Sequence, residues 1–119
     1  MRSKYGNRKV KRDGIVFDSK HEADRWNELK LLEKAGEISN LRRQVKYVLI
    51  PKQYSTHEFT KRGKPRVAEQ EVSYVADFVY TDNMFNMEIV EDVKGMRTKD
   101  YIIKRKLMLW VHGIEISEV

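Results

Sequence analysis

The sequence predicts a fold of the α/β (α+β) class, in which helices flank a mixed β-sheet and a β-hairpin stands near the N-terminus. Apolar residues alternate with the two-residue period of strands in several short runs, above all within residues 73–95. Two other segments carry apolar residues at helical spacing. After the hairpin, the expected order is helix, strand, strand, strand, helix, strand. With 119 residues, we expect one domain covering residues 1–119.

Turn and capping signals predict the first elements. Residues 8–17 place Asp13-Gly14 between two short apolar runs, which is typical of a β-hairpin. Ser19 is a good helix N-cap, and the helical spacing that follows continues until Gly36. The residues of this helix that we expect in the core are Trp26, Leu29, Leu31 and Leu32.

The next segment is predicted to be a turn and a strand, followed by a polar excursion. Residues 38–51 alternate in burial character, with Tyr47 and Leu49 on one face, and Pro51 ends the strand or places it at an edge. Residues 52–70 are polar and predict a hairpin tip or a mobile loop. Four cations lie within six residues of that segment: Lys61, Arg62, Lys64 and Arg66. They are either solvated charges or contacts for a phosphate backbone, and we favour contact.

Residues 73–95 predict two apolar strands joined by a polar turn, each with a carboxylate inside it. Asp77 interrupts an apolar strand whose two faces are otherwise hydrophobic. In the second strand, Asp92 and Lys94 share one face because successive side chains point to opposite sides. We therefore expect two acids and a lysine to converge.

The last elements are a helix over residues 99–112, capped by Thr98 and Gly113, and a strand over residues 114–119 that closes the sheet. Helical spacing predicts a buried stripe on this helix, formed by Ile103, Leu107, Trp110 and Val111.

Charge points to a polyanionic partner. Lys and Arg number 24 against 18 Asp and Glu, a net charge of +6, which favours nucleic acid, although a merely basic surface is the alternative. The N-terminal arm adds Arg2, Lys4, Arg8 and Lys9. We expect no membrane partner and a cytoplasmic location, because no apolar run approaches a membrane span or a signal peptide and cysteine is absent.

Phosphodiester hydrolysis suits the predicted cluster. Asp77 and Asp92 offer the oxygen ligands that magnesium prefers, and Lys94 is placed to orient an attacking water. The alternatives are a hydrogen-bonded buried acid at Asp77 and an ion pair between Asp92 and Lys94. Glu22 stands three residues after Ser19, so it either joins the cluster or completes a capping box.

These residues resemble a known superfamily. Ala76-Asp77, followed by Asp92-Val93-Lys94 and preceded by Glu22 on a helix, resembles the PD-(D/E)XK nucleases. The strings YGNRKV, FDSKHEA, YVADFVY and VEDVKG are similar to a small phage and prophage family of that superfamily, whose members are mostly of unknown function. The order of elements also resembles the Holliday junction resolvases of the phage endonuclease I type.

The resemblance implies a restriction-endonuclease-like fold and a Mg²⁺-dependent DNA endonuclease, with Mn²⁺ able to substitute. It implies that Asp77, Asp92 and the Val93 carbonyl bind metal, that Glu22 does so directly or through water, and that Lys94 positions the water. It further implies branched or duplex DNA as substrate, a homodimer and the cytoplasm of the host cell. The residues that we expect to bind DNA are Arg8, Lys9, Lys61, Arg62, Lys64, Arg66, Lys99 and Lys104.

Three positions depart from the superfamily pattern or complicate it. Ala76 replaces the proline, and Asp92 stands where many members have glutamate. Glu91 neighbours Asp92 on the opposite face, so a bulge would exchange their roles. The alternative function is a non-catalytic DNA-binding accessory protein that keeps the fold and the basic surface.

Overall fold

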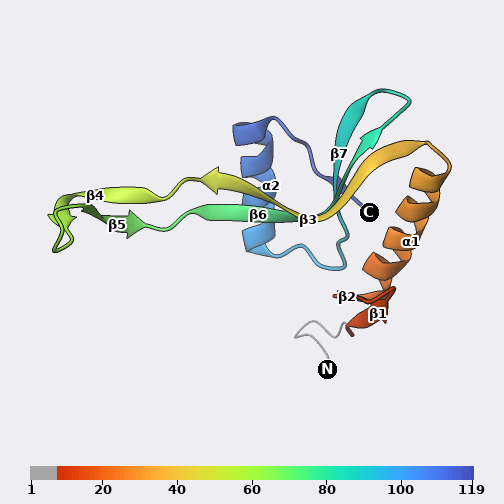
Figure 1. The fold of residues 1–119 in the computed structure, drawn as a ribbon, viewed down its shortest axis with the longest axis horizontal. Helices are drawn as coiled ribbons and strands as arrows, with labels where there is room; N and C mark the ends of the chain where they lie inside the picture. The colour runs from red at the N-terminus through yellow and green to blue at the C-terminus, as the bar shows by residue number, and fades with distance from the viewer. Residues whose placement is uncertain (1–7) are drawn as a thin grey trace. The chain divides into compact units, whose positions relative to one another are not determined.

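The computed structural model describes residues 8–119 and confirms the predicted α+β class (Figure 1). Its elements, in chain order, are β1 Val10–Arg12, β2 Ile15–Phe17, α1 Lys20–Lys34, β3 Ile38–Ile50, β4 Gln53–Phe59, β5 Pro65–Glu69, β6 Val72–Asp82, β7 Met87–Asp92, α2 Lys99–His112 and β8 Ser117–Glu118. One sheet has the order β3-β6-β7-β8, and it is mixed because β7 pairs antiparallel with β6 but parallel with β8. Arg2 and Lys4 of the predicted basic arm lie outside the described residues.

The chain groups into two compact units. Unit 1 holds the chain up to Val45, together with Ala76–Met96 and Ile116–Val119, and unit 2 holds Lys46–Val75 and Arg97–Glu115. The boundaries cut through β3 and β6, so each unit takes part of both strands. One domain over residues 1–119 stays a prediction. Neither helix in the described part of the chain is long and apolar enough to cross a membrane.

The start of unit 1 forms as its turn and cap residues predict. Asp13 and Gly14 have φ values of 52° and 78°, the left-handed conformations that a two-residue hairpin turn of type I′ needs. β1 and β2 pair antiparallel on either side of them. Helix α1 begins after Ser19, whose hydroxyl accepts a hydrogen bond of 3.1 Å from the Glu22 backbone N–H.

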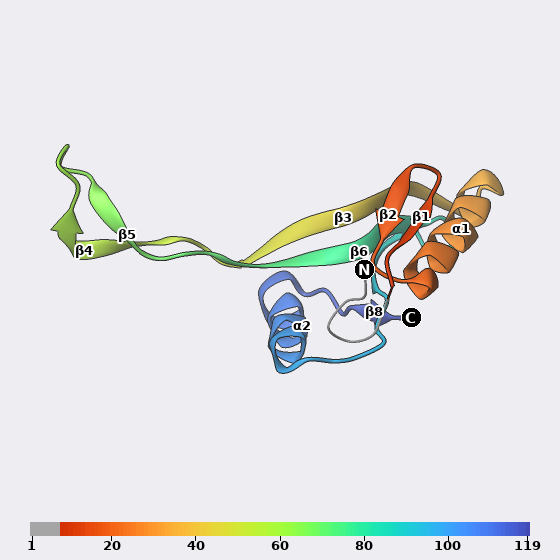
Figure 2. The ribbon, with the colours of Figure 1, turned by 90° about the horizontal axis from the view of Figure 1, so that it is seen from below.

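The core of unit 1 lies between α1, the β1–β2 hairpin and the sheet, and Figure 2 shows the hairpin beside α1. Its buried residues are Phe17, Ala23, Leu29, Ile38, Phe78 and Tyr80. Trp26 stacks on Phe78 with ring centroids 5.9 Å apart. The prediction that Leu31 is a core residue is wrong, since 68% of it is exposed. Leu29 and Leu32 already cover the core from that turn of the helix, so Leu31 faces solvent.

The antiparallel register of β6 and β7 decides which acids meet. Phe78 lies opposite Glu91, and Tyr80 lies opposite Ile89. One step further along the same register, Asp77 lies opposite Asp92. Beyond the end of β7, the Val119 N–H donates to the Asp92 carbonyl (3.1 Å) and the Lys94 N–H donates to the Val119 carbonyl (3.3 Å). Pairing with the C-terminal segment therefore holds residues 92–94 in place.

Helix α2 of unit 2 has the predicted bounds but not the predicted buried face. Thr98 and Gly113 cap it, and Gly113 has a left-handed φ of 67°. The buried stripe expected from Ile103, Leu107, Trp110 and Val111 is wrong: Trp110 is 83% exposed, Ile103 and Val111 are also exposed, and Leu107 is half-buried.

Tyr101 and Met108 are buried on α2 instead. Tyr101 packs against Tyr74, with ring centroids 6.4 Å apart. At the other end of the helix, the His112 ring meets Tyr47 edge-on, and its Nε2 donates to the Val48 carbonyl at 2.7 Å. These long-range aromatic contacts select a face of α2 that helical spacing alone does not reveal.

Two substitutions on α2 test this assignment. Met108→Ala is expected to destabilise the protein by about 2–4 kcal/mol, because it removes a fully buried side chain and leaves a cavity. Trp110→Ala is expected to change the free energy of unfolding by no more than about 0.5 kcal/mol, because that side chain already contacts water. Urea unfolding measures both. If Trp110→Ala lowers the free energy of unfolding more than Met108→Ala does, the buried face predicted from the sequence would be the correct one.

Candidate active site

The structure brings the four predicted catalytic residues together in unit 1. Glu22 lies in the first turn of α1, Asp77 in β6, Asp92 at the last position of β7 and Lys94 two residues later. A cleft of about 270 Å³ opens beside them. It is lined by Asp18, Ser19, His21, Glu22, Asp77, Val93, Lys94 and Gly95.

Hydrogen bonds and an ion pair connect the residues of the two strands. Asp77 Oδ2 accepts a hydrogen bond of 2.9 Å from the Val93 backbone N–H. Lys94 Nζ lies 3.0 Å from Asp92 Oδ1, and the carboxyl groups of Asp77 and Asp92 are hydrogen-bonded to each other. Asp92 is only 3% exposed, whereas Lys94 reaches the cleft. Two acids and a lysine therefore converge, as the strand pattern predicts.

Glu22 combines a role at the helix end with a place in the cleft. Its backbone N–H is capped by Ser19, and its buried carboxylate accepts a backbone hydrogen bond at Asp18. The Gln44 amide lies 3.5 Å from Glu22 Oε1. In a capping box, the Glu22 carboxylate would accept a hydrogen bond from the backbone N–H of the N-cap residue, Ser19. Its backbone partner here is Asp18, one residue earlier, so the capping box does not form. Its negative charge also reaches Asp77 and raises the pKa of that acid.

Sequence comparison adds the family. A family model described as "Protein of unknown function (DUF1064)" matches residues 2–113. The chain belongs to the DUF1064 family. No curated protein and no solved structure matches it. Every residue that lines the cleft of this DUF1064 protein lies within the matched range.

Burial and crowded negative charge make the cleft of this DUF1064 protein unfavourable for free carboxylates. Burial, together with the charges of Asp92 and Glu22, raises the pKa of Asp77 to about 8, although the hydrogen bond from the Val93 N–H opposes the shift. Burial also raises the pKa of Glu22, with help from the charge of Asp18. Near neutral pH, the cluster therefore favours a bound proton or another positive charge.

The donor set suits a magnesium ion better than a structural metal. Among residues 8–119, no three His, Cys, Asp or Glu side chains already form a metal cage. Magnesium does not need one, because it binds through one or two carboxylates and keeps waters and substrate phosphates as its other ligands. Asp77 and Asp92 supply two hard oxygen donors from opposed strand positions, with the Val93 main chain beside them. These residues therefore fit the ion that the resemblance implies.

Glu91 has a different environment from Asp92, although the two are neighbours and both are buried. Arg25 binds it with two nitrogens, Nε to Oε1 at 2.9 Å and Nη2 to Oε2 at 2.6 Å, and the Tyr80 hydroxyl donates to it. These contacts raise the pKa of Arg25, while burial and the Glu91 carboxylate raise the pKa of Tyr80. β6 and β7 pair without a register shift up to Glu91. No bulge exchanges Glu91 with Asp92.

The sequence did not predict that two residues of β3 lie near the site. Gln44 has a left-handed φ of 53°, which interrupts the regular strand beside Glu22. Arg43 lies over the ring of Phe17 at 4.7 Å, and its charge partly opposes the rise in the pKa of Glu22. Both reach the site only because β3 packs near α1, and nothing in the local sequence signals that contact. By contrast, Asp18 and His21 lie close in sequence to the candidate acid Glu22. That position was enough to predict that they line the cleft.

The predicted DNA-binding residues are divided between the units. Arg8 and Lys9 belong to unit 1, where Lys9 lies 3.5 Å from Asp18 at the cleft. The other residues belong to unit 2: Lys61, Arg62, Lys64 and Arg66 on or beside the β4–β5 turn, and Lys99 and Lys104 on α2.

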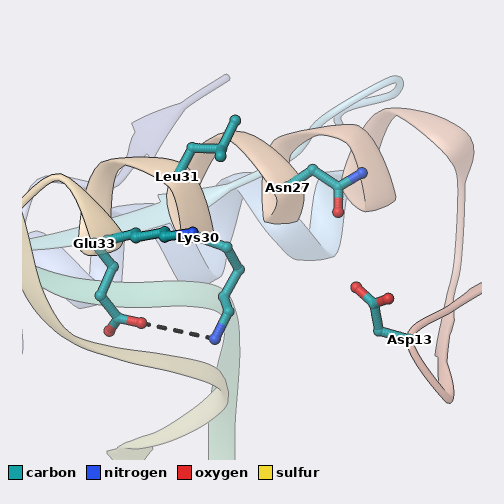
Figure 3. Close-up of a pocket in the computed structure, with 6 residues that line it drawn as sticks. Asp13, Asn27, Lys30, Leu31 and Glu33 are labelled. Carbon is teal, nitrogen blue, oxygen red and sulfur yellow. Dashed lines mark ion pairs between the residues drawn. The ribbon is translucent and has the colours of Figure 1, made fainter.

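A larger hollow of about 570 Å³ lies elsewhere in unit 1, along the second half of α1 (Figure 3). It is lined by Asp13, Asn27, Lys30, Leu31, Glu33 and Lys34. Lys30 and Glu33 neutralise each other across 3.7 Å, and exposed Leu31 forms part of the wall. The hollow brings no reactive group to a buried position, so the smaller acidic cleft is the better candidate site.

The ion pair of Arg25 can be tested by comparing its two carboxylate partners. Glu91→Gln is expected to cost about 2–4 kcal/mol, because it leaves the Arg25 charge in a low-dielectric environment with only Glu28 to compensate it. Glu28→Gln removes the exposed partner of the same arginine and is expected to cost no more than about 1 kcal/mol. Chemical denaturation of both variants gives the comparison. Equal losses of unfolding free energy in the two variants would mean that the buried ion pair of Arg25 with Glu91 is no stronger than its exposed pair with Glu28.

The raised pKa of Asp77 predicts how stability depends on pH. A carboxyl with a higher pKa in the folded than in the unfolded chain contributes stability that is complete below its ordinary pKa of 3.8 and is lost as pH rises through about 8. Asp77→Asn keeps an acceptor oxygen but cannot ionise. Its melting temperature in EDTA is expected to exceed that of the wild type near pH 8, with the difference closing towards pH 4.

The exposed acid Glu115 provides the control for this titration. Glu115→Gln removes one negative charge from an exposed position, so it shows what the loss of a charge alone does to the melting temperature. A constant difference between Asp77→Asn and the wild type from pH 4 to pH 8 would show that Asp77 titrates normally in the folded protein.

Proposed function

We propose that this DUF1064 protein is a Mg²⁺-dependent DNA endonuclease that hydrolyses phosphodiester bonds. One observation carries the proposal: Asp77 and Asp92 lie opposite each other on adjacent antiparallel strands, with Lys94 3.0 Å from Asp92 at a cleft that also contains Glu22. A protein that only bound DNA would gain nothing from buried acids facing a polyanion. The cost of holding these acids together is explained if they work with a cation on a phosphate.

Asp77, Asp92 and the Val93 carbonyl are the groups that would hold the ion, with Glu22 binding it directly or through water. Bound there, Mg²⁺ or Mn²⁺ supplies charge neutralisation for the phosphate and favours deprotonation of a nearby water. The rigid register of β6 and β7 fixes the two acids before substrate arrives. This preorganisation means that little rearrangement is needed during the reaction.

Lys94 positions the nucleophile. Its amino group lies 3.0 Å from Asp92 and lines the cleft, and a lysine at that place can donate a hydrogen bond to a water or to a phosphate oxygen. A water held this way forms the new bond to phosphorus while the bond from phosphorus to the leaving sugar oxygen breaks. The hydrogen bonds of residues 92 and 94 to Val119 hold the main chain from which the lysine side chain extends.

The finer function that we propose is selectivity for branched DNA, such as a Holliday junction, in phage recombination or replication. The net charge of +6 supports a DNA partner in general, and the resemblance to junction resolvases supports the branched substrate. Symmetric cleavage of a junction requires two active sites, so this proposal includes a homodimer acting in the host cytoplasm.

Cleavage of labelled DNA tests the proposal. Four-way junction, flap and linear duplex substrates are incubated with wild type, Asp92→Asn or Lys94→Met, in Mg²⁺, in Mn²⁺ or in EDTA. Wild type is expected to cut only with a divalent ion. Each variant is expected to lose about 100-fold or more in rate, the scale expected for a group that positions or activates the nucleophile.

Glu115→Gln is the matched control, since it removes an exposed carboxylate in unit 2 and should cut like the wild type. The ranking of substrates decides between a junction resolvase and a less selective endonuclease. Full activity in Asp92→Asn would remove Asp92 from the mechanism. Metal-independent DNA binding without cleavage of any substrate would identify a non-catalytic accessory protein instead.

A further inference from the structure

The β4–β5 hairpin of unit 2 is exposed along almost its whole length. β4 and β5 pair antiparallel with each other and form a two-stranded sheet of their own. Every residue of the two strands except Ser55 is exposed. Among them are two aromatic side chains, Tyr54 and Phe59, which are 58% and 53% exposed. A two-stranded hairpin without a core is marginally stable in water, so contact with a partner would stabilise this one.

The turn of the hairpin is closed by backbone hydrogen bonds and carries cations. The Gly63 N–H donates to the Thr60 carbonyl at 2.9 Å, and the Thr60 N–H donates to the Lys64 carbonyl at 2.7 Å. Gly63 has a φ of 79°, a left-handed conformation that glycine adopts without strain. Lys61 and Arg62 therefore occupy the two central positions of a closed β-turn, where side chains project outward.

Charge identifies the ligand class. Residues 52–69 contain five Lys and Arg against two Glu, which is half of the net charge of the whole chain in 18 residues. Lys61, Arg62 and Lys64 form no ion pair with any residue in the range 8–119. Arg66, on β5, donates a hydrogen bond from Nε to the carbonyl of Phe59 on the paired strand β4, at 3.2 Å. Unpaired cations on an exposed ribbon complement a polyanion.

The width of the two-stranded ribbon formed by β4 and β5 indicates which kind of polyanion it fits. Paired strands lie about 4.8 Å apart, so with its side chains a two-stranded ribbon fits the B-DNA major groove, which is about 12 Å wide. The minor groove, about 6 Å wide, does not admit it. Exposed apolar side chains such as Tyr54 and Phe59 also have a counterpart in the major groove, where thymine methyl groups offer apolar surface.

We infer that the β4–β5 ribbon inserts into the major groove of duplex DNA, with the cations of its turn on the phosphates that border the groove. The inference rests on the proposed function for the identity of the polymer, and it adds that the substrate must include a duplex segment. Lys61 and Lys64 supply phosphate contacts that are independent of sequence. A single-stranded substrate offers no groove and is bound more weakly.

Dimethyl sulfate footprinting tests the groove. The reagent methylates guanine N7 in the major groove and adenine N3 in the minor groove, so one reaction reports on both. Full-length wild type is bound to a linear duplex in EDTA, where cleavage does not interfere. We expect a run of guanines to be protected and adenines to stay reactive. Protection of adenines alone would overturn the inference.

The salt dependence of binding tests the cations. Lys61→Gln/Lys64→Gln is expected to lower the slope of log K against log salt by about 2, from loss of two phosphate contacts at about 0.9 each. The control Lys30→Gln/Lys34→Gln removes the same charge from α1 in unit 1 and should leave the slope unchanged. Equal effects of the two variants would mean that the ribbon has no special contact with DNA.

The remaining outcomes are also decisive. If a second copy of the chain covers the ribbon, the hairpin variant will change the sedimentation coefficient and leave the footprint unaltered, which contradicts groove binding. Failure of wild type to bind duplex at low salt contradicts it as well. Metal-dependent cleavage is scored in separate reactions, so a nuclease without the footprint would refute the ribbon and keep the proposed function.

Discussion

The buried pair of Glu91 and Arg25 is the interaction on which the geometry of the cleft depends. Glu91 is 1% exposed, and burying a lone carboxylate would be prohibitively costly. Two nitrogens of Arg25 and the Tyr80 hydroxyl satisfy it. Because Arg25 belongs to α1 and Glu91 to β7, the pair holds the helix to the strand. Glu22 lies three residues before Arg25, so the same contact sets the position of Glu22 beside Asp77.

Two adjacent buried acids therefore have opposite roles. Glu91 is compensated by a bidentate arginine and a hydroxyl, and its charge is structural. Asp92 faces Asp77, with Glu22 close enough to raise the pKa of Asp77, and Lys94 is the cation paired with Asp92. The structure tolerates this excess of acid beside a cleft that gives access to solvent. Stored electrostatic cost of this kind is typical of sites that bind cations or perform catalysis.

Local rules predicted the parts of the fold that local residues decide. Asp13-Gly14 forms its turn, and Ser19, Thr98 and Gly113 cap their helices, because each acts through the backbone of its neighbours. The meeting of Asp77 with Asp92 was also predictable, since a short polar turn makes consecutive strands pair. The features that the sequence did not predict depend on contacts between residues far apart in the chain. The buried face of α2 is chosen by packing of Tyr101 on Tyr74, and no periodicity reports that choice.

The division of the chain into units also separates two kinds of stability. Unit 1 is held by a core with aromatic stacking and a buried ion pair. In unit 2, the buried apolar side chains are Leu49, Tyr74, Tyr101 and Met108, and the β4–β5 ribbon adds almost no buried surface. A ribbon of that kind must lose conformational freedom when it binds, which subtracts from affinity. The closed turn at Thr60 and Gly63 reduces this loss, because it fixes the direction of Lys61 and Arg62 before any contact is made.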